Sequence, residues 1–121
     1  MAFEDTLAIR VVRKHADGVT VECPLRKDYI NSQGVLHGGV IASIADEAAW
    51  HAMLHAYDGQ RNATTSELKI NYLRPIGGTK VLARATVLRA GKTLCVSRVD
   101  LLDTEKRLAA VGIVTYMLLP A

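Results

Sequence analysis

The segment that most constrains the fold is residues 38–57, whose pattern differs from everything around it. It is rich in alanine and contains no proline, and its apolar residues recur at helical spacing. Those positions are Ile41, Ile44, Ala45, Ala48 and Ala49. Asp58-Gly59 then provides a C-terminal stop signal. We therefore expect one helix from Gly38 to Tyr57, about 30 Å long and apolar enough around its circumference to be deeply buried.

The rest of the chain has the alternation of apolar and polar residues that is typical of β-strands. Before the helix, Asp17-Gly18 predicts a turn between two strands, and Arg26 to Leu36 is expected to form a loop. The expected strands are residues 7–14, 19–23, 63–73, 80–88, 94–102 and 108–119. Consecutive hairpins after the helix predict an antiparallel sheet. The predicted fold class is α+β, an antiparallel sheet of about six strands wrapped around one long central helix.

The size and the net charge of the chain indicate how many domains it has and what kind of partner it binds. A chain of 121 residues has the size of one domain, residues 1–121, and so short a chain leaves apolar surface that an oligomer would cover. The net charge of +3 comes without a dense run of Lys or Arg. This argues against a nucleic-acid partner and suits an anionic small molecule.

Targeting and metal signals are weak. Cys23 and Cys95 are far apart and lie in no metal-binding or disulfide motif. Glu47, His51 and His55 share helical spacing but lack a metalloprotease signature, so we expect no metal. The N-terminus has no apolar signal segment, and no apolar run reaches the roughly 18 residues that span a bilayer. We expect a cytoplasmic protein without a membrane partner.

Residues suited to chemistry are concentrated between Asn31 and Asp46. Gly38 and Gly39 stand at the expected start of the helix, where free backbone amides form an electropositive site for an anion or a developing oxyanion. Asn31 and His37 place polar groups beside that point. Asp46 interrupts an Ala/Ile-rich helix, where burying a carboxylate without partners is costly.

The spacing of these groups bears on assembly. Asp46 follows Gly39 by seven residues, so both lie on one face of the helix, about 10.5 Å apart along its axis. That separation is too large for both groups to act on one carbonyl. If both are catalytic, they must come from two different chains, which predicts a dimer with shared active sites.

The pattern N-x-x-G-x-x-H-G-G-x-x-x-x-x-x-D at residues 31–46 resembles that of hotdog-fold acyl-CoA thioesterases of the phenylacetate-pathway (PaaI-like) type. The resemblance covers nearly the whole chain, including Tyr72-Leu73-Arg74-Pro75 and the turn at residues 89–93. It implies the hotdog fold and hydrolysis of an aryl- or medium-chain acyl-CoA to a free acid and CoA. CoA is then part of the substrate, and no cofactor is expected.

The resemblance also implies roles for single residues. The amide of Gly38 or Gly39 would polarise the thioester carbonyl, with Asn31 and His37 shaping that oxyanion region. Asp46, supplied by the other subunit, would activate water as a general base or attack as a nucleophile, and both roles stay open.

Further candidates rest on the same resemblance. Thr65 corresponds to a hydroxyl residue that orients water, with Thr64 and Ser66 as alternatives in register. Glu47 neighbours Asp46 and a related branch uses a Glu, but the motif spacing favours Asp46. The candidates for substrate binding are Arg74, Lys92 and Arg89 for the CoA phosphates and Trp50, which could equally be a core residue, for the acyl pocket.

Two other functions are alternatives to a thioesterase. A hotdog acyl-CoA hydratase usually pairs an Asp with a His five residues later, whereas His37 precedes Asp46 by nine residues. A non-catalytic acyl-CoA-binding module needs no acid, so the presence of Asp46 argues against it. We therefore predict a thioesterase that assembles as a homodimer or as a homotetramer built from two dimers.

Overall fold

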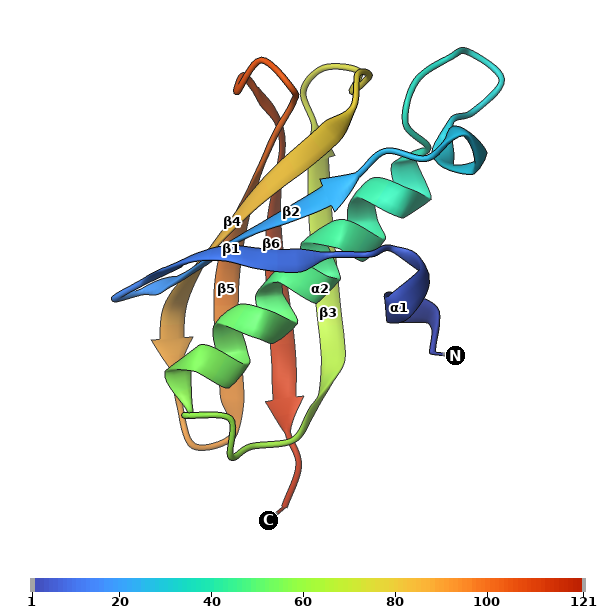
Figure 1. The fold of residues 1–121 in the computed structure, drawn as a ribbon. Helices are drawn as coiled ribbons and strands as arrows, with labels where there is room; N and C mark the ends of the chain where they lie inside the picture. The colour runs from blue at the N-terminus through green and yellow to red at the C-terminus, as the bar shows by residue number, and fades with distance from the viewer. Residues whose placement is uncertain (1, 121) are drawn as a thin grey trace.

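The computed structural model of the chain describes residues 2–120 and shows an antiparallel sheet wrapped around a long helix (Figure 1). The helices are α1 (Phe3–Thr6) and α2 (Gly38–Ala56), with a 3-10 turn at Lys27–Tyr29. The strands are β1 (Arg10–His15), β2 (Gly18–Pro24), β3 (Ala63–Tyr72), β4 (Lys80–Ala90), β5 (Leu94–Leu102) and β6 (Leu108–Leu118). The predicted α+β class, with a six-stranded sheet around one long helix, is confirmed.

The order of strands in the sheet is β1-β2-β4-β5-β6-β3. β3 therefore lies at an edge beside β6, and the expected hairpin between β3 and β4 is wrong. The connection of residues 73–79 instead crosses the end of the sheet, a span of about 14 Å at the usual strand spacing. Ile76 anchors this crossing, because its side chain is fully buried and its carbonyl accepts a hydrogen bond from the Leu36 amide. Alternation along the sequence predicts the strands but not their order, because a sheet with β3 beside β4 and a sheet with β3 beside β6 fit the same alternation.

The first strand begins at Arg10 and not at Leu7 as expected. Residues 3–6 form α1, and Leu7 is its C-cap. Ala8 has a positive φ of 54°, which turns the chain between the helix and the strand. Leu7 is almost fully buried. Leu7, which was expected to begin a strand, thus packs into the core at the end of a short helix.

α2 crosses the inner face of the sheet, where it contacts β4, β2 and β5 most closely (Figure 1). Its buried residues are Ile41, Ile44, Ala45, Ala48, Ala49, Ala52 and Met53. The predicted helix is confirmed to within one residue, but deep burial holds for one face only. The half-buried residues away from this face include Ser43, Asp46, Glu47, Trp50, His51 and Leu54. None of the helices within residues 2–120 is long and apolar enough to cross a membrane.

β1 and β3 are the edges of the sheet, each with a neighbour on one side only. β3 is ten residues long, and the large apolar side chains of Tyr72 and Leu73 at its end are exposed. The free edge of such a strand presents unpaired backbone groups that can pair with another chain. Thr65 of this strand contacts Asp46 of α2.

Candidate active site

Asp46 is held by side chains from two strands. It lies half-buried on α2 and faces the neighbouring strands β3 and β6. The Thr65 hydroxyl of β3 donates a hydrogen bond to Asp46 Oδ1 at 2.9 Å. The Tyr116 hydroxyl of β6 lies 2.7 Å from Oδ1 and 2.7 Å from the backbone carbonyl oxygen of Asp46. Two hydroxyl groups therefore serve as partners for this carboxylate, which would be costly to bury alone.

The second carboxylate oxygen of Asp46 is in a different situation. Among residues 2–120, no group donates a hydrogen bond to Oδ2. Asp46 lines a pocket of about 280 Å³ together with Thr65 and Tyr116. Its remaining lining residues are Glu4, Glu47, Trp50, Ala63 and Thr64. One oxygen of the carboxylate is thus anchored, and the other is free to meet a ligand.

Glu47 is the other carboxylate on this stretch of α2. Burial raises its pKa, and the nearby carboxylates of Glu4, Asp46 and Asp5 raise it further. Its Oε2 lies 3.9 Å from Nε2 of His51. Within the described residues, no hydroxyl group of β3 or β6 donates a hydrogen bond to Glu47. Asp46, which the motif spacing favoured, has two such donors.

Sequence reasoning missed Tyr116. It is paired with Thr65 across β3 and β6, and both side chains are directed towards α2. Its ring is buried and meets the ring of Trp50 edge-on, with centroids 5.8 Å apart. The alternation of Val114, Tyr116 and Leu118 is a signal that could have placed it on the inner face, where a buried tyrosine hydroxyl needs a partner. Which partner depends on the strand order.

The glycines at the start of α2 form the second polar element. His37 is the N-cap, and its Nδ1 accepts a hydrogen bond from the Gly39 amide at 2.9 Å. Nδ1 must therefore be unprotonated, which leaves any ring proton on Nε2. The Gly38 amide has no acceptor among residues 2–120. Of the two amides predicted to polarise a carbonyl, Gly38 is available and Gly39 is engaged.

Two further residues shape this glycine turn. Asn31 Oδ1 accepts hydrogen bonds from the amides of Gln33 and Val35, at 2.9 Å and 3.3 Å, and so fixes the loop before α2. The Tyr72 hydroxyl of β3 donates to the Gly38 carbonyl at 2.7 Å. Asn31 therefore fixes the loop conformation, because its side chain bonds backbone amides of the same loop.

Gly38 and Asp46 line two different pockets. The pocket at Gly38 has a volume of about 330 Å³ and is mostly apolar, lined by Val35, Leu36, Ile41 and residues 72–76. The pocket at Asp46 lies further along α2, beside β3 and β6. One chain alone therefore does not bring the free glycine amide and the carboxylate to the same point.

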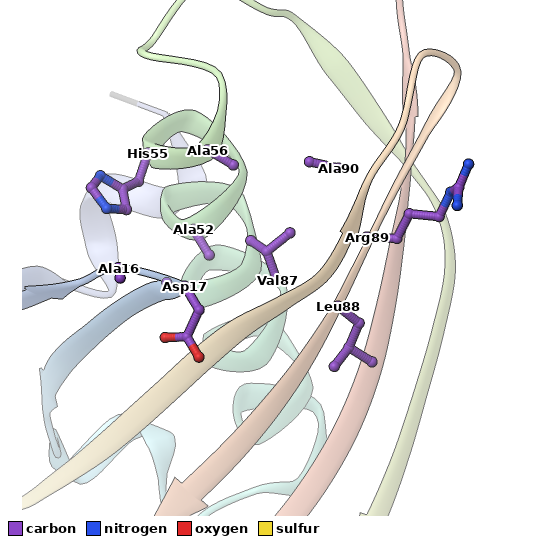
Figure 2. Close-up of a pocket in the computed structure, with 10 residues that line it drawn as sticks. Ala16, Asp17, Ala52, His55, Ala56, Val87, Leu88, Arg89 and Ala90 are labelled. Carbon is purple, nitrogen blue, oxygen red and sulfur yellow. The ribbon is translucent and has the colours of Figure 1, made fainter.

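The basic residues predicted for substrate binding are also separated. Arg74 follows β3 and lines the Gly38 pocket. Arg89 lies near the end of β4, and Lys92 lies in the turn between β4 and β5, at the other end of the sheet. Figure 2 shows Arg89 pointing away from α2 at a pocket of about 490 Å³, which His55 and Val87 also line. Within one chain, Arg74 cannot contact the same phosphate as Arg89 and Lys92.

The two histidines of α2, His51 and His55, contact different partners. His51 pairs with Glu47, and burial lowers the pKa of its imidazole. His55 Nε2 lies 2.8 Å from the backbone carbonyl of His15. Within residues 2–120 there is no group of three or more side chains placed to hold a metal ion.

Comparison with known proteins places this geometry in a family. Residues 33–110, more than half of the chain, match the Thioesterase superfamily. The chain is 34% identical over 99 residues to the medium/long-chain acyl-CoA thioesterase YigI of Escherichia coli strain K12, and the aligned region covers 71% of this chain. It spans 64% of the length of that relative.

Solved structures agree with this assignment. The thioesterase HI1161 from Haemophilus influenzae matches with a TM-score of 0.87 and 26% identity, over 95% of this chain and 80% of that chain. A variant of the phenylacetic acid degradation protein PaaI from Thermus thermophilus matches with a TM-score of 0.83 and 25% identity, over 95% and 96% of the two chains. The predicted resemblance is confirmed: the chain belongs to the thioesterase superfamily, has its hotdog fold, and is a thioester hydrolase.

Proposed function

We propose that the protein hydrolyses acyl-CoA thioesters to a free acid and CoA, with Asp46 as the catalytic carboxylate. The observation that carries the proposal is the state of this carboxylate, whose Oδ1 is anchored while Oδ2 faces no protein donor within residues 2–120. A carboxylate fixed in this way is suited to take a proton from water, or to attack the thioester itself. Both routes end in the same products.

The Gly38 amide completes the chemistry. A backbone N–H at a helix N-terminus stabilises negative charge that develops on a carbonyl oxygen. Within the described residues the Gly38 amide is free, whereas the Gly39 amide is bonded to His37. We therefore assign the oxyanion role to Gly38 and a structural role to His37 and Gly39. Asn31 supports the same loop, and Thr65 orients the carboxylate through its bond to Oδ1.

We further propose that the active site is shared between two chains. Asp46 and Gly38 line separate pockets in one protomer, so a second protomer must supply the missing group. The free edge of β3 is the natural place for two copies to meet, because it lies beside Thr65 and is unpaired on one side. Pairing there would also cover part of the half-buried face of α2. Two such dimers could associate into a tetramer.

The substrate is proposed to be an aryl- or medium-chain acyl-CoA. Trp50 lines the Asp46 pocket, and the Gly38 pocket is mostly apolar. YigI, a relative of this chain, acts on medium- and long-chain acyl-CoA, as its name states. Arg74 beside Gly38 is placed to bind a phosphate of CoA, whereas Arg89 and Lys92 could contribute only from another subunit. A cytoplasmic location suits such a substrate.

The first experiment is release of CoA thiol from a panel of aryl- and alkyl-CoA esters, followed with a thiol-reactive dye. Asp46→Asn should lower kcat by about 100- to 10,000-fold, because it removes the base or nucleophile while keeping the shape of the side chain. The matched control is Glu47→Gln on the next residue of the same helix, which should keep most of the activity. Turnover by Asp46→Asn at the wild-type rate would contradict the assignment. Binding of the esters without release by the wild type would indicate a binding module.

A further inference from the structure

We propose that Tyr116 is a positioning residue for the hydrolysis, holding the Asp46 carboxylate in one orientation through both of its protonation states. The inference rests on the proposed thioesterase activity of Asp46. It concerns a residue outside the motif of residues 31–46, on β6, the last strand along the chain.

Geometry is the first support. The Tyr116 hydroxyl lies 2.7 Å from both Oδ1 and the backbone carbonyl oxygen of Asp46. It therefore contacts the residue at two points, one on the side chain and one on the main chain. Fixing both points limits rotation of the carboxylate about its side-chain bonds. Thr65 adds a second donor to Oδ1, so that Oδ2 is the oxygen left for water or substrate.

The ring of Tyr116 is itself immobilised. Its side chain is buried on the inner face of β6, and the ring of Trp50 packs edge-on against it at an interplanar angle of 61°. A tyrosine has few rotatable bonds, so little conformational entropy opposes this arrangement. The hydroxyl is thus delivered to Asp46 by a rigid support.

The proton count gives the second support. The hydroxyl has one proton, and the two acceptors to which it donates among residues 2–120 are both on Asp46. While the carboxylate is charged, Oδ1 attracts that proton more strongly. When Oδ2 takes a proton from water, Oδ1 loses negative charge, and the backbone carbonyl can take a larger share. Tyr116 can therefore serve Asp46 before and after proton transfer without a change of rotamer.

The surroundings keep Tyr116 a donor. Burial, followed by the hydrogen bond to Asp46, raises the pKa of its phenol far above the usual value. The other titratable groups around this pocket are Glu47 and His51 of α2 and Glu4 and Asp5 of α1. The carboxylates among them disfavour a phenolate by repulsion. The hydroxyl thus stays protonated over the working range of the enzyme.

Tyr57 shows what a purely structural tyrosine looks like in this fold. Its hydroxyl also donates one hydrogen bond to a backbone carbonyl, that of Gly91, at 2.6 Å. It follows the last residue of α2, eleven residues after Asp46, or about 16 Å along the helix axis. Tyr57→Phe therefore removes the same kind of group at a distance from the carboxylate, and it is the matched control.

The test compares Tyr116→Phe, Tyr57→Phe and the wild type in thiol release. Tyr116→Phe should lower kcat by about 10- to 100-fold, the effect of one hydrogen bond to a charged group, with little change in KM. The acid limb of its pH profile should move to higher pH, because losing a donor to the carboxylate favours its protonated form. Tyr57→Phe should keep the kcat and the pH profile of the wild type and lose only thermal stability.

The outcomes separate the two proposals. If neither the wild type nor Tyr57→Phe releases thiol, the proposed thioesterase function fails. If both are active and Tyr116→Phe matches them in kcat and pH profile, the positioning role is wrong. If Tyr116→Phe does not fold, 3-fluorotyrosine placed at position 116 keeps the ring and the hydroxyl and makes the phenol a stronger donor. The acid limb should then move to lower pH, and an unchanged limb would overturn the inference.

Discussion

The two halves of the proposed site are built in opposite ways. The Gly38 half is mainly local: His37 caps its own helix, and Asn31 bonds amides two and four residues ahead. Its distant contacts are the hydrogen bond of Tyr72 to Gly38 and that of Leu36 to Ile76. The Asp46 half is assembled from three elements, and Tyr116 is 70 residues away in sequence. The oxyanion half thus depends on a loop conformation, while the acid half depends on the strand order of the whole sheet.

The local half can be broken at a single backbone atom. Gly38→Pro removes the free amide and leaves the side-chain chemistry of the site intact. Proline is favoured at the first residue of a helix, and His37 has the extended backbone that precedes proline, with φ −61° and ψ 135°. We expect kcat to fall about 100- to 1,000-fold, as for other lost oxyanion donors, with the fold retained by circular dichroism.

Gly38→Ala is the control for this change. It keeps the amide, and its Cβ would meet the Tyr72 hydroxyl at 3.4 Å, an ordinary contact. We expect it to retain most of the activity. Equal loss in Gly38→Pro and Gly38→Ala would show that space, and not the N–H, matters at this position.

Mixing the two broken halves tests whether they come from different chains. Asp46→Asn and Gly38→Pro should each be nearly inactive alone. Refolded together in equal amounts, about half of the dimers would be mixed, and each mixed dimer would contain one intact site, giving about a quarter of the wild-type activity. Native mass spectrometry of differently tagged chains checks that mixed dimers form. Mixed dimers without recovered activity would place both groups of one site in the same chain.

The acid half can be weakened step by step. Thr65→Val keeps the shape of an exposed side chain and removes one donor to Asp46 Oδ1. We expect kcat to fall about 10-fold, because Tyr116 still holds the same oxygen. Ser66→Ala, at the bulge between Thr65 and Glu67, should leave kcat unchanged. A larger loss at Ser66 than at Thr65 would move the functional hydroxyl to the alternative register.

This difference between the halves also explains what the sequence could predict. The helix, its glycine start and the positions of Asn31 and His37 follow from local patterns, and Gly38 to Ala56 is helical nearly as expected. The bulge after Thr65 shifts the alternation of β3, so Thr64, Thr65 and Ser66 could be separated only in three dimensions.

The hydrogen-bond partners of Asp46 could not be predicted from local sequence patterns, for a related reason. Thr65 and Tyr116 meet Asp46 side by side because β3 pairs with β6 and not with β4. That pairing depends on the crossing of residues 73–79, whose anchor is the burial of Ile76. Tyr72 at the end of β3 and Ile76 in the crossing bond Gly38 and Leu36, so the distant contacts of the local half also depend on strand order.

Tyr72→Phe tests the first of these contacts and should have the smallest effect. The Tyr72 hydroxyl bonds the Gly38 carbonyl and not its amide, so its loss leaves the oxyanion donor in place. The side chain is about half exposed, at 52%, and water can replace the lost donor. We therefore expect kcat to fall only about 2- to 5-fold, within the net value of one neutral hydrogen bond. A loss as large as that of Gly38→Pro would mean that the glycine turn keeps its catalytic conformation only through β3, and the site would then be non-local in both halves.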